Sequence, residues 1–232
     1  GDVYKRQVGK DAHVEAGSTV TGRKKIKDGQ RWSGSPAKKV GRSKHRFPSH
    51  APKRRPWWVA IYGATSILLA FQPIVALAVG AAVVVGLIAV TDGSPYVGSI
   101  FFAPLGALAA FATFMLQTWL GVRILSLGIK PGVAPVRSAK GWRLWAIERL
   151  MDEARTQLFP IYASQITPAW LRSLGATIGK NVEISTAVMV PKLTEVKDGA
   201  FLADDTMIGG YELGGGWMLT GETKVCLLYT SD

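Results

Sequence analysis

The sequence contains few of the side chains that build metal and redox centres. Among its 232 residues it has one cysteine, Cys226, and three histidines. A single thiol excludes internal disulfides and thiolate metal clusters, because both need more than one cysteine. We therefore expect neither a structural disulfide nor a metal centre in this chain.

Acidic residues are scarce in the N-terminal part of the chain. The sequence holds 28 Lys and Arg against 16 Asp and Glu, a net charge of +12. Residues 1–55 carry 16 of the basic and 4 of the acidic side chains, whereas residues 56–232 carry 12 of each. The whole excess (16 − 4 = 12) lies in this basic arm, which is typical of a segment that meets nucleic acid or anionic lipid.

Charge is almost absent from the segment that follows. Between Pro56 and Val122 the only charged residue is Asp92, in a turn-like Thr-Asp-Gly-Ser-Pro sequence. Each flanking apolar run exceeds the roughly 20 residues that cross about 30 Å of hydrocarbon as a helix. The sequence predicts transmembrane helices over 57–91 and 96–128, the first tilted or bent near Pro73 because it is overlong. The alternative is a pair of core helices in a large soluble protein, but such helices seldom run so long without charge.

The composition of the two runs fits a membrane hairpin. Aromatic side chains stand where interfaces are expected, and small residues permit close approach of the helices. The aromatic residues are Trp57, Trp58, Tyr62, Tyr96 and Trp119, and the small residues are Gly80, Ala81, Ala82, Gly106, Ala109 and Ala110.

Basic residues lie on both outer flanks of the hairpin and not in its turn. Lys and Arg recur over 38–55 and again over 123–143. By the positive-inside rule we expect an integral, multi-pass protein of the bacterial plasma membrane, with both soluble segments cytoplasmic and the Asp92 turn outside. Anionic lipids would then contact the basic juxtamembrane linker, residues 42–56, so no nucleic-acid partner is expected.

Aliphatic residues recur at every sixth position in the C-terminal segment. The positions are Ile178, Ile184, Val190, Val196, Leu202 and Ile208, and those four further on are small or β-branched: Val182, Val188, Thr194, Ala200 and Thr206. This spacing is typical of hexapeptide coils in a left-handed parallel β-helix. The same step relates Val8, Val14, Val20, Ile26 and Trp32 near the N-terminus. The alternative is coincidence within another β-rich domain.

These patterns define the expected organisation of the chain. The fold class is a two-helix transmembrane pair between the end of one left-handed β-helix, residues 8–41, and the start of another, residues 176–224. Residues 140–175 are expected to hold an amphipathic helix and a short helix, the first lying either on headgroups or against the β-helix. The end segments 1–7 and 225–232 resemble translated sequencing-adaptor read-through, and we expect them to be foreign to the fold.

The sequence from Val136 to Trp217, and most specifically AFLADDTMIGGYELGGGW at its end, resembles the C-terminal membrane region of poly-lysine-synthetase-type non-ribosomal peptide synthetases. In that family helix pairs alternate with hexapeptide-repeat, acyltransferase-like domains. The resemblance implies amide formation between amino acids that are delivered as carrier thioesters. Its implied partners are the carrier and adenylation domains of a parent chain. A phosphopantetheine thioester is implied for the parent, with no cofactor bound by this fragment, which alone is expected to be inactive.

Amide formation from a thioester needs a group that takes the amine proton and donors that hold the oxyanion. The candidate catalytic residues are Asp204, Asp205, Glu212 and Tyr211, and the candidate substrate-binding backbone is that of Gly209, Gly210, Gly214 and Gly215. The alternative is that the acidic side chains are only solvated and that the glycines provide the backbone angles of turns. Hexapeptide acyltransferases usually use a histidine base, but His13, His45 and His50 all lie outside the second repeat segment. Two further hypotheses therefore stay open, a non-catalytic anchor or scaffold of such a synthetase and a different membrane-tethered acyltransferase.

Overall fold

The computed structural model describes residues 8–15, 17–21, 25–43, 47–91 and 94–226. The chain forms two units, Gly1–His50 and Ala51–Asp232, and each is described by itself. Residues 1–7, most of the 225–232 segment, His45 and the Asp92 turn lie outside the described residues, so the predictions made for them stay predictions.

The N-terminal unit contains three short strands, β1 (His13–Val14), β2 (Gln30–Ser33) and β3 (Lys38–Arg42). Val14 pairs in parallel with Trp32, and Val8 forms a parallel bridge with Ile26, so both pairs join residues 18 apart. Strand β3 then returns antiparallel to β2. The side chains of Ile26, Trp32 and Ala37 form a small buried core. Of the predicted series, Ile26 and Trp32 are buried in this core and Val14 and Val20 pack against it, whereas Val8 is exposed.

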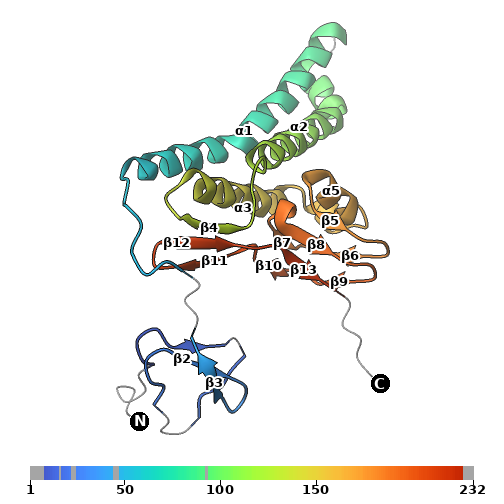
Figure 1. Cartoon of the computed structure of the whole chain (residues 1–232). Helices are drawn as coiled ribbons and strands as arrows, with labels where there is room; N and C mark the ends of the chain where they lie inside the picture. Colours follow the sequence, from blue (N-terminus) through green and yellow to red (C-terminus); the bar gives the residue numbers. More distant parts are fainter. Residues whose placement is uncertain (1–7, 16, 22–24, 44–46, 92–93, 227–232) are drawn as a thin grey trace. The chain divides into compact units, whose positions relative to one another are not determined.

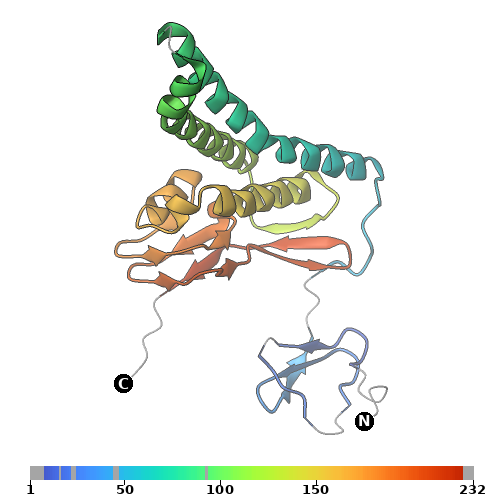
Figure 2. The ribbon, with the colours of Figure 1, turned by 180° about the vertical axis from the view of Figure 1, so that it is seen from behind.

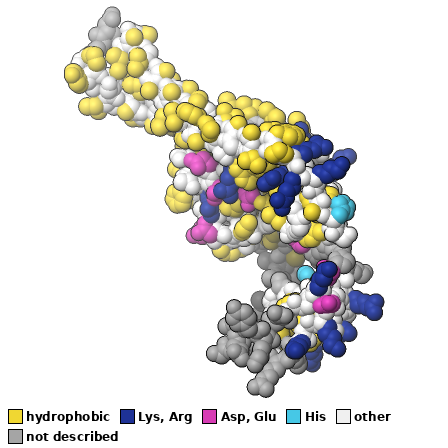
Figure 3. Space-filling view, turned by 90° about the vertical axis from the view of Figure 1, so that its left-hand side faces the viewer, with side chains coloured by type: hydrophobic (Ala, Val, Ile, Leu, Met, Phe, Trp, Pro, Cys, Tyr) yellow, Lys and Arg dark blue, Asp and Glu magenta, His cyan; other side chains and the backbone are white. Residues whose placement is uncertain are grey.

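Two long helices form the hairpin of the second unit (Figure 1). Helix α1 spans Trp57–Thr91 and helix α2 spans Pro95–Leu125, and both are long and apolar enough to cross a membrane. Helix α2 ends three residues before the predicted 128, and Gly128 with φ of +71° turns the chain towards the next strand. Their outward side chains are hydrophobic over most of the surface (Figure 3).

The two helices approach closely at glycines. A Cβ atom added at Gly80 would lie 2.5 Å from the carbonyl oxygen of Gly106, and one at Gly106 would lie 2.9 Å from that of Gly80. A buried polar contact lies nearer the soluble end, where Gln72 Nε2 donates to Thr118 Oγ1 over 3.0 Å. Because both partners are buried, this bond satisfies groups that would otherwise be costly to desolvate.

Helix α1 changes direction partway along its length, so that its first part lies over helix α3 and its second part follows α2 (Figure 2). The helix contains Pro73, which removes a backbone hydrogen bond and is the usual cause of such a bend. The first part is tied to the soluble layer, because the Tyr62 hydroxyl donates to the Val136 carbonyl over 2.9 Å and Trp142 Nε1 donates to Thr65 Oγ1 over 2.9 Å.

Three helices separate the hairpin from the strands: α3 (Ala139–Gln157), α4 (Phe159–Tyr162) and α5 (Thr167–Leu174). In α3 the Ser138 side chain caps the N-terminus by accepting from the Gly141 N–H over 3.2 Å. Leu144, Ile147 and Leu150 are fully or almost fully buried, because the hairpin covers one side of the helix and strands cover the other. The helix therefore packs within the unit.

Short parallel strands form the layer beneath these helices: β5 (Thr177–Ile178), β6 (Glu183–Ile184), β7 (Val188–Met189), β8 (Thr194–Val196), β9 (Phe201–Leu202) and β10 (Met207–Ile208). Ile178 pairs with Val196 and Ile184 pairs with Leu202, each across 18 residues. All six aliphatic residues of the predicted repeat are buried, namely Ile178, Ile184, Val190, Val196, Leu202 and Ile208. The six-residue step therefore identified the inward side chains correctly.

The repeat is interrupted after β10. Strands β11 (Tyr211–Gly214) and β12 (Trp217–Thr220) form an antiparallel hairpin, and β12 also pairs with β4 (Gly132–Pro135). Its two-residue turn has positive φ at Gly215 (+59°) and Gly216 (+86°), as a type I′ turn requires. Strand β13 (Thr223–Val225) then rejoins β8 in parallel, with Val225 opposite Val196. The segment 176–224, which was expected to form a continuous run of coils, thus contains an antiparallel hairpin. Strand β13 ends at Val225, one residue inside the segment 225–232 that was expected to be foreign to the fold.

Burial of Tyr162 makes the folded unit sensitive to alkaline pH. Desolvation raises the pKa of this fully buried phenol to about 12, although Trp170 Nε1 donates to its oxygen over 3.3 Å. Because the unfolded phenol ionises near pH 10, the contribution to stability is complete below pH 10 and is lost as pH rises to about 12. We expect the free energy of unfolding to fall by up to about 1.4 kcal/mol per pH unit in this window. Unfolding measured against pH should show a smaller slope for Tyr162→Phe, and equal slopes would contradict the prediction.

Candidate functional site

A cleft of about 1190 Å³ opens between the C-terminal end of α3, the following α4 segment and the turns of the parallel strands. Its lining includes Arg155 from α3, Glu183 and Ser185 from the β6 region, and the adjacent Asp204 and Asp205. The two aspartates lie in the short turn that connects β9 to β10. Two of the predicted catalytic residues therefore line a concave surface.

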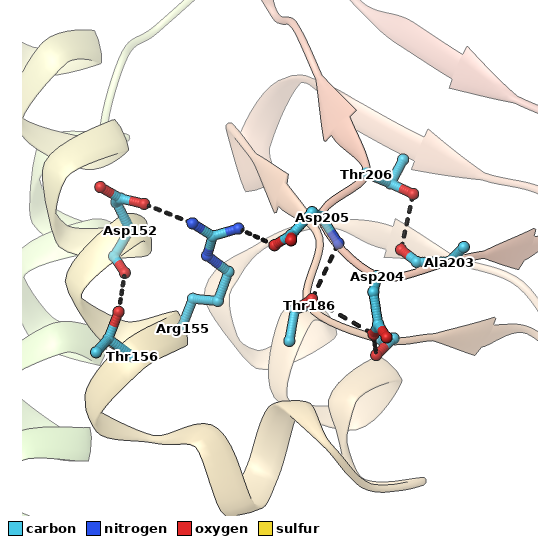
Figure 4. A network of polar contacts seen from close by, with 9 residues as sticks. Asp152, Arg155, Thr156, Thr186, Ala203, Asp204, Asp205 and Thr206 are labelled. Carbon is cyan, nitrogen blue, oxygen red and sulfur yellow. Dashed lines mark hydrogen bonds and ion pairs between the residues drawn. The ribbon is translucent and has the colours of Figure 1, made fainter.

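Asp205 is fixed from two directions (Figure 4). Its backbone has φ of +57°, a conformation that Asp adopts more readily than most residues, and its N–H donates to Thr186 Oγ1 over 3.0 Å. Its carboxylate accepts from Arg155 Nη1 over 2.6 Å, and the other guanidinium nitrogen, Nη2, lies 3.1 Å from Asp152 Oδ1. Arg155 thus joins the last turns of α3 to the strand layer.

Asp204 points to a different set of partners in the same turn (Figure 4). Its Oδ1 atom accepts from the Ser185 hydroxyl and, at 3.5 Å, from the Thr186 hydroxyl. Residues 186 and 204 are 18 apart, which is the spacing of the parallel pairs, so the register of the short strands brings this hydroxyl and this carboxylate together. The neighbouring carboxylates therefore have separate environments, one with hydroxyl donors and one with a guanidinium.

The cleft has an acidic edge. Three carboxylates line it, from Glu183, Asp204 and Asp205, against one cationic side chain, that of Arg155. The Asp205 side chain is 80% exposed and Arg155 is 26% exposed, so solvent and ligands reach the pair. This excess of negative charge favours a positively charged ligand such as an ammonium group.

Tyr211 contacts the same helix at another place. Its hydroxyl donates to Glu148 Oε2 over 2.5 Å. Burial, followed by the hydrogen bond to Glu148 and its negative charge, raises the pKa of Tyr211 well above the usual range, so the phenol stays protonated near neutral pH. Glu148 and Arg155 are separated by seven residues, roughly 10 Å along a helix. Tyr211 is not among the residues that line the cleft, so its predicted catalytic role gains no support from its position.

The predicted glycine backbone and Glu212 also lie away from the cleft lining. The Gly209 carbonyl accepts from Thr223 Oγ1 and the Gly210 carbonyl accepts from the Gly221 N–H, so both glycines support the strand that rejoins the layer. Gly214 pairs with Trp217 in the hairpin, Gly215 forms its turn, and Glu212 is an exposed residue of β11. The structure thus brings Asp204 and Asp205 together in the cleft, whereas Glu212 and the four glycines lie outside its lining.

Sequence reasoning missed Arg155, Ser185 and Thr186 as members of this site. Three of the six-residue steps make 18 residues, and this spacing would have found Thr186, because it places that residue beside Asp204. No local pattern distinguishes Arg155 from the other basic residues of α3. Within the described ranges, no group of three or more His, Cys, Asp and Glu side chains is arranged to hold a metal ion. No histidine occurs in residues 51–232, so a histidine base is absent from this unit's sequence.

The site and the hairpin define a chain that joins two helices fit to cross a membrane to short-stranded sheets with an acidic cleft. The chain is similar to the delta-poly-L-ornithine synthetase of Acinetobacter baumannii, with 27% identity over 231 aligned residues. The alignment covers 93% of this chain and 17% of that synthetase, so the chain spans a small part of the relative's length. No family model and no solved structure matches the chain. The similarity therefore relates this chain to a small region of one poly-ornithine synthetase.

Proposed function

We propose that this chain is part of the membrane-bound region of a non-ribosomal peptide synthetase that joins amino acids through amide bonds. The similarity to a synthetase named for a polymer of ornithine supports this proposal. The parallel strands with 18-residue offsets support a second element of it, that each soluble segment is built on a left-handed hexapeptide β-helix.

In this proposal the hairpin crosses the plasma membrane and both soluble segments lie in the cytoplasm. The apolar surfaces of α1 and α2 support membrane insertion, and the basic residues before α1 and after α2 support the orientation. The basic linker then contacts anionic lipids, and the adenylation and carrier domains of the synthetase act on the same side of the membrane.

The cleft binds the amine of the acceptor amino acid or peptide. The observation that carries this assignment is the acidic edge formed by Glu183, Asp204 and Asp205. An incoming ammonium group would find carboxylates that Ser185 and Arg155 hold in place. Amide formation needs the neutral amine, so the ammonium group first gives one proton to a base. The amine nitrogen then attacks the carbonyl carbon, the carbon–sulfur bond breaks, and the second proton that the nitrogen loses protonates the leaving thiolate. We assign to Asp204 the binding of the ammonium group and the acceptance of its proton.

We do not assign the phosphopantetheine group of the carrier domain to this cleft. A phosphopantetheine group carries a phosphate, and the cleft's one cationic side chain, Arg155, already contacts Asp152 and Asp205. The residues of the cleft therefore do not fit the phosphate end of such a group, and the assigned role is limited to the acceptor amine.

The second candidate function is a non-catalytic scaffold, and a specific observation favours it. Both aspartates have hydrogen-bond or ion-pair partners within the chain, as structural turn residues do. In that case the Asp205–Arg155 pair serves only to fasten α3 to the strand layer.

Asp204→Asn in the full-length synthetase separates the two candidates. The change keeps the size of the side chain and its acceptor oxygen but removes the charge. We expect product formation to fall by about tenfold or more, because a charge-assisted contact contributes about 1.5–3 kcal/mol. Membranes containing the variant would be supplied with ATP and the amino acid, and the product measured by mass spectrometry.

The matched control is Glu222→Gln, which removes an exposed carboxylate that does not line the cleft. It should leave product formation unchanged. Equal activity of both variants, with equal amounts inserted in the membrane, would favour the scaffold.

A further inference from the structure

A second cavity, of about 360 Å³, lies where three distant segments of the second unit meet. The segment before α1 contributes Lys53 and Arg54, the segment after β4 contributes Arg137, and the β11–β12 turn contributes Gly215 and Gly216. The lining residues include three cations and no carboxylate. This cavity is separate from the acidic cleft and has the opposite charge.

The three segments are held together by packing and backbone hydrogen bonding. A Cβ atom at Gly216 would lie 3.1 Å from Pro52 Cδ, so Pro52 sits directly on the hairpin turn. The Val136 N–H donates to the Gly216 carbonyl over 3.0 Å. The wall that carries the cations is therefore anchored to the β layer by these contacts.

The cations of this cavity are available to a ligand. In the described part of the chain, no ion pair connects Lys53, Arg54 or Arg137 to a carboxylate. Lys53, Arg54 and Arg137 are exposed, and Lys and Arg side chains gather on the surface beside the hydrophobic hairpin (Figure 3). Converging cations without carboxylate partners on a concave surface favour an anion.

The cavity adjoins the part of the unit that is expected at the membrane surface. Arg54 precedes Trp57 by three residues, and the rings of Trp57 and Trp58 stack with centroids 4.4 Å apart. Val136, which also lines the cavity, accepts a hydrogen bond from the Tyr62 hydroxyl. Tryptophan and tyrosine concentrate at the level of lipid headgroups, so an anion at this height is a phosphate of the membrane.

We propose that the cavity lined by Lys53, Arg54 and Arg137 binds the phosphate of an anionic phospholipid headgroup. The site fixes the first part of α1 and the β11–β12 hairpin against the membrane surface. The proposal does not depend on amide chemistry in the cleft, but it rests on the proposed membrane insertion of the hairpin. A chain that stayed dissolved without detergent would overturn the insertion, which distinguishes that failure from loss of this site.

The test measures lipid retention by the detergent-purified 232-residue chain after mixing with equal amounts of phosphatidylglycerol and phosphatidylcholine. Native mass spectrometry reports the ratio of the two lipids bound. Arg54→Gln together with Arg137→Gln should lower the preference for phosphatidylglycerol by about fivefold for each charge removed. Lys180→Gln together with Lys192→Gln removes the same charge from exposed residues outside both the cavity lining and the basic linker, and it should leave the preference nearly unchanged.

Competition with inorganic phosphate identifies the source of the phosphate group. If millimolar phosphate leaves the bound phosphatidylglycerol in place, the ligand is the lipid, as we expect. Displacement would assign the same cations to a free phosphate and overturn the lipid as the ligand. The site itself is contradicted if the cavity variant retains the native preference, or if both double variants lose it equally.

Discussion

Gly80→Ala is expected to destabilise the helix pair, whereas Gly86→Ala in the same helix is not. A Cβ atom at Gly80 would lie 2.5 Å from the Gly106 carbonyl oxygen and 2.9 Å from the Ala110 Cβ, a clash that only movement of a helix backbone relieves. Overpacking of this kind costs about 1–3 kcal/mol, and Gly80→Leu should lie at the upper end of that range.

The control position has open space around it. Nothing lies within 4 Å of a Cβ atom added at Gly86, so the alanine there gains helix propensity without a clash. Unfolding in mixtures of dodecyl sulfate and a mild detergent, followed by circular dichroism, measures both variants under the same conditions. Indistinguishable midpoints for Gly80→Ala and Gly86→Ala would show that the helices do not pack through these glycines.

The hairpin could be predicted because its signal is local. A segment of more than sixty residues with a single charge specifies two long apolar helices, whatever the rest of the chain packs against them. Helix α1 begins and ends at the predicted residues. Contacts that join distant segments left no such signal. Tyr62, which was expected at a membrane interface, donates to a partner 74 residues away, and Trp142 donates to a partner 77 residues away.

The strand layer was predictable only in its repeating part. The six-residue step selects buried side chains, five of which lie in β5, β6, β8, β9 and β10, while Val190 directly follows β7. It does not report where a hairpin is inserted. Gly214 and Gly215 were interpreted as substrate-binding backbone, but Gly214 ends a hairpin strand, and Gly215 with Gly216 provides the positive φ angles of a tight antiparallel turn.

Of the four candidate catalytic residues, two line the cleft and two do not, and the reason is again the inserted hairpin. Paired acids are visible in a sequence, so Asp204 and Asp205 were found, and both line the cleft. Arg155 was not, because its role depends on the packing of α3 beside the β9–β10 turn. Glu212 and Tyr211 are close to the aspartates in sequence, but their strand leads into the inserted hairpin and Tyr211 meets α3 about two turns away from Arg155.

Arg155→Gln should separate activity from stability more sharply than any change of the aspartates. The Arg155–Asp205 pair is partly exposed, and such pairs contribute at most about 1 kcal/mol to folding. In the proposed cleft, however, Arg155 holds Asp205, which is next to Asp204 on the acidic edge that binds the acceptor amine. Loss of Arg155 frees one carboxylate of the edge that binds the ammonium group. A charge-assisted contact contributes about 1.5–3 kcal/mol, so we expect product formation by the full-length synthetase to fall by about tenfold or more.

Arg149→Gln is the matched control, because Arg149 lies on the same helix and pairs with the same Asp152, at 3.7 Å, without lining the cleft. It should keep nearly full activity. Arg155 acts here as a positioning residue, so its loss should raise the acceptor concentration needed for half-maximal rate while the thermal midpoint changes little. Arg155→Lys retains the charge but cannot reach both Asp152 and Asp205 with a planar fork, and it should restore only part of the activity. If Arg155→Gln matched Arg149→Gln in rate and in acceptor dependence, the cleft would have no part in the reaction, and the ion pair would serve the fold alone.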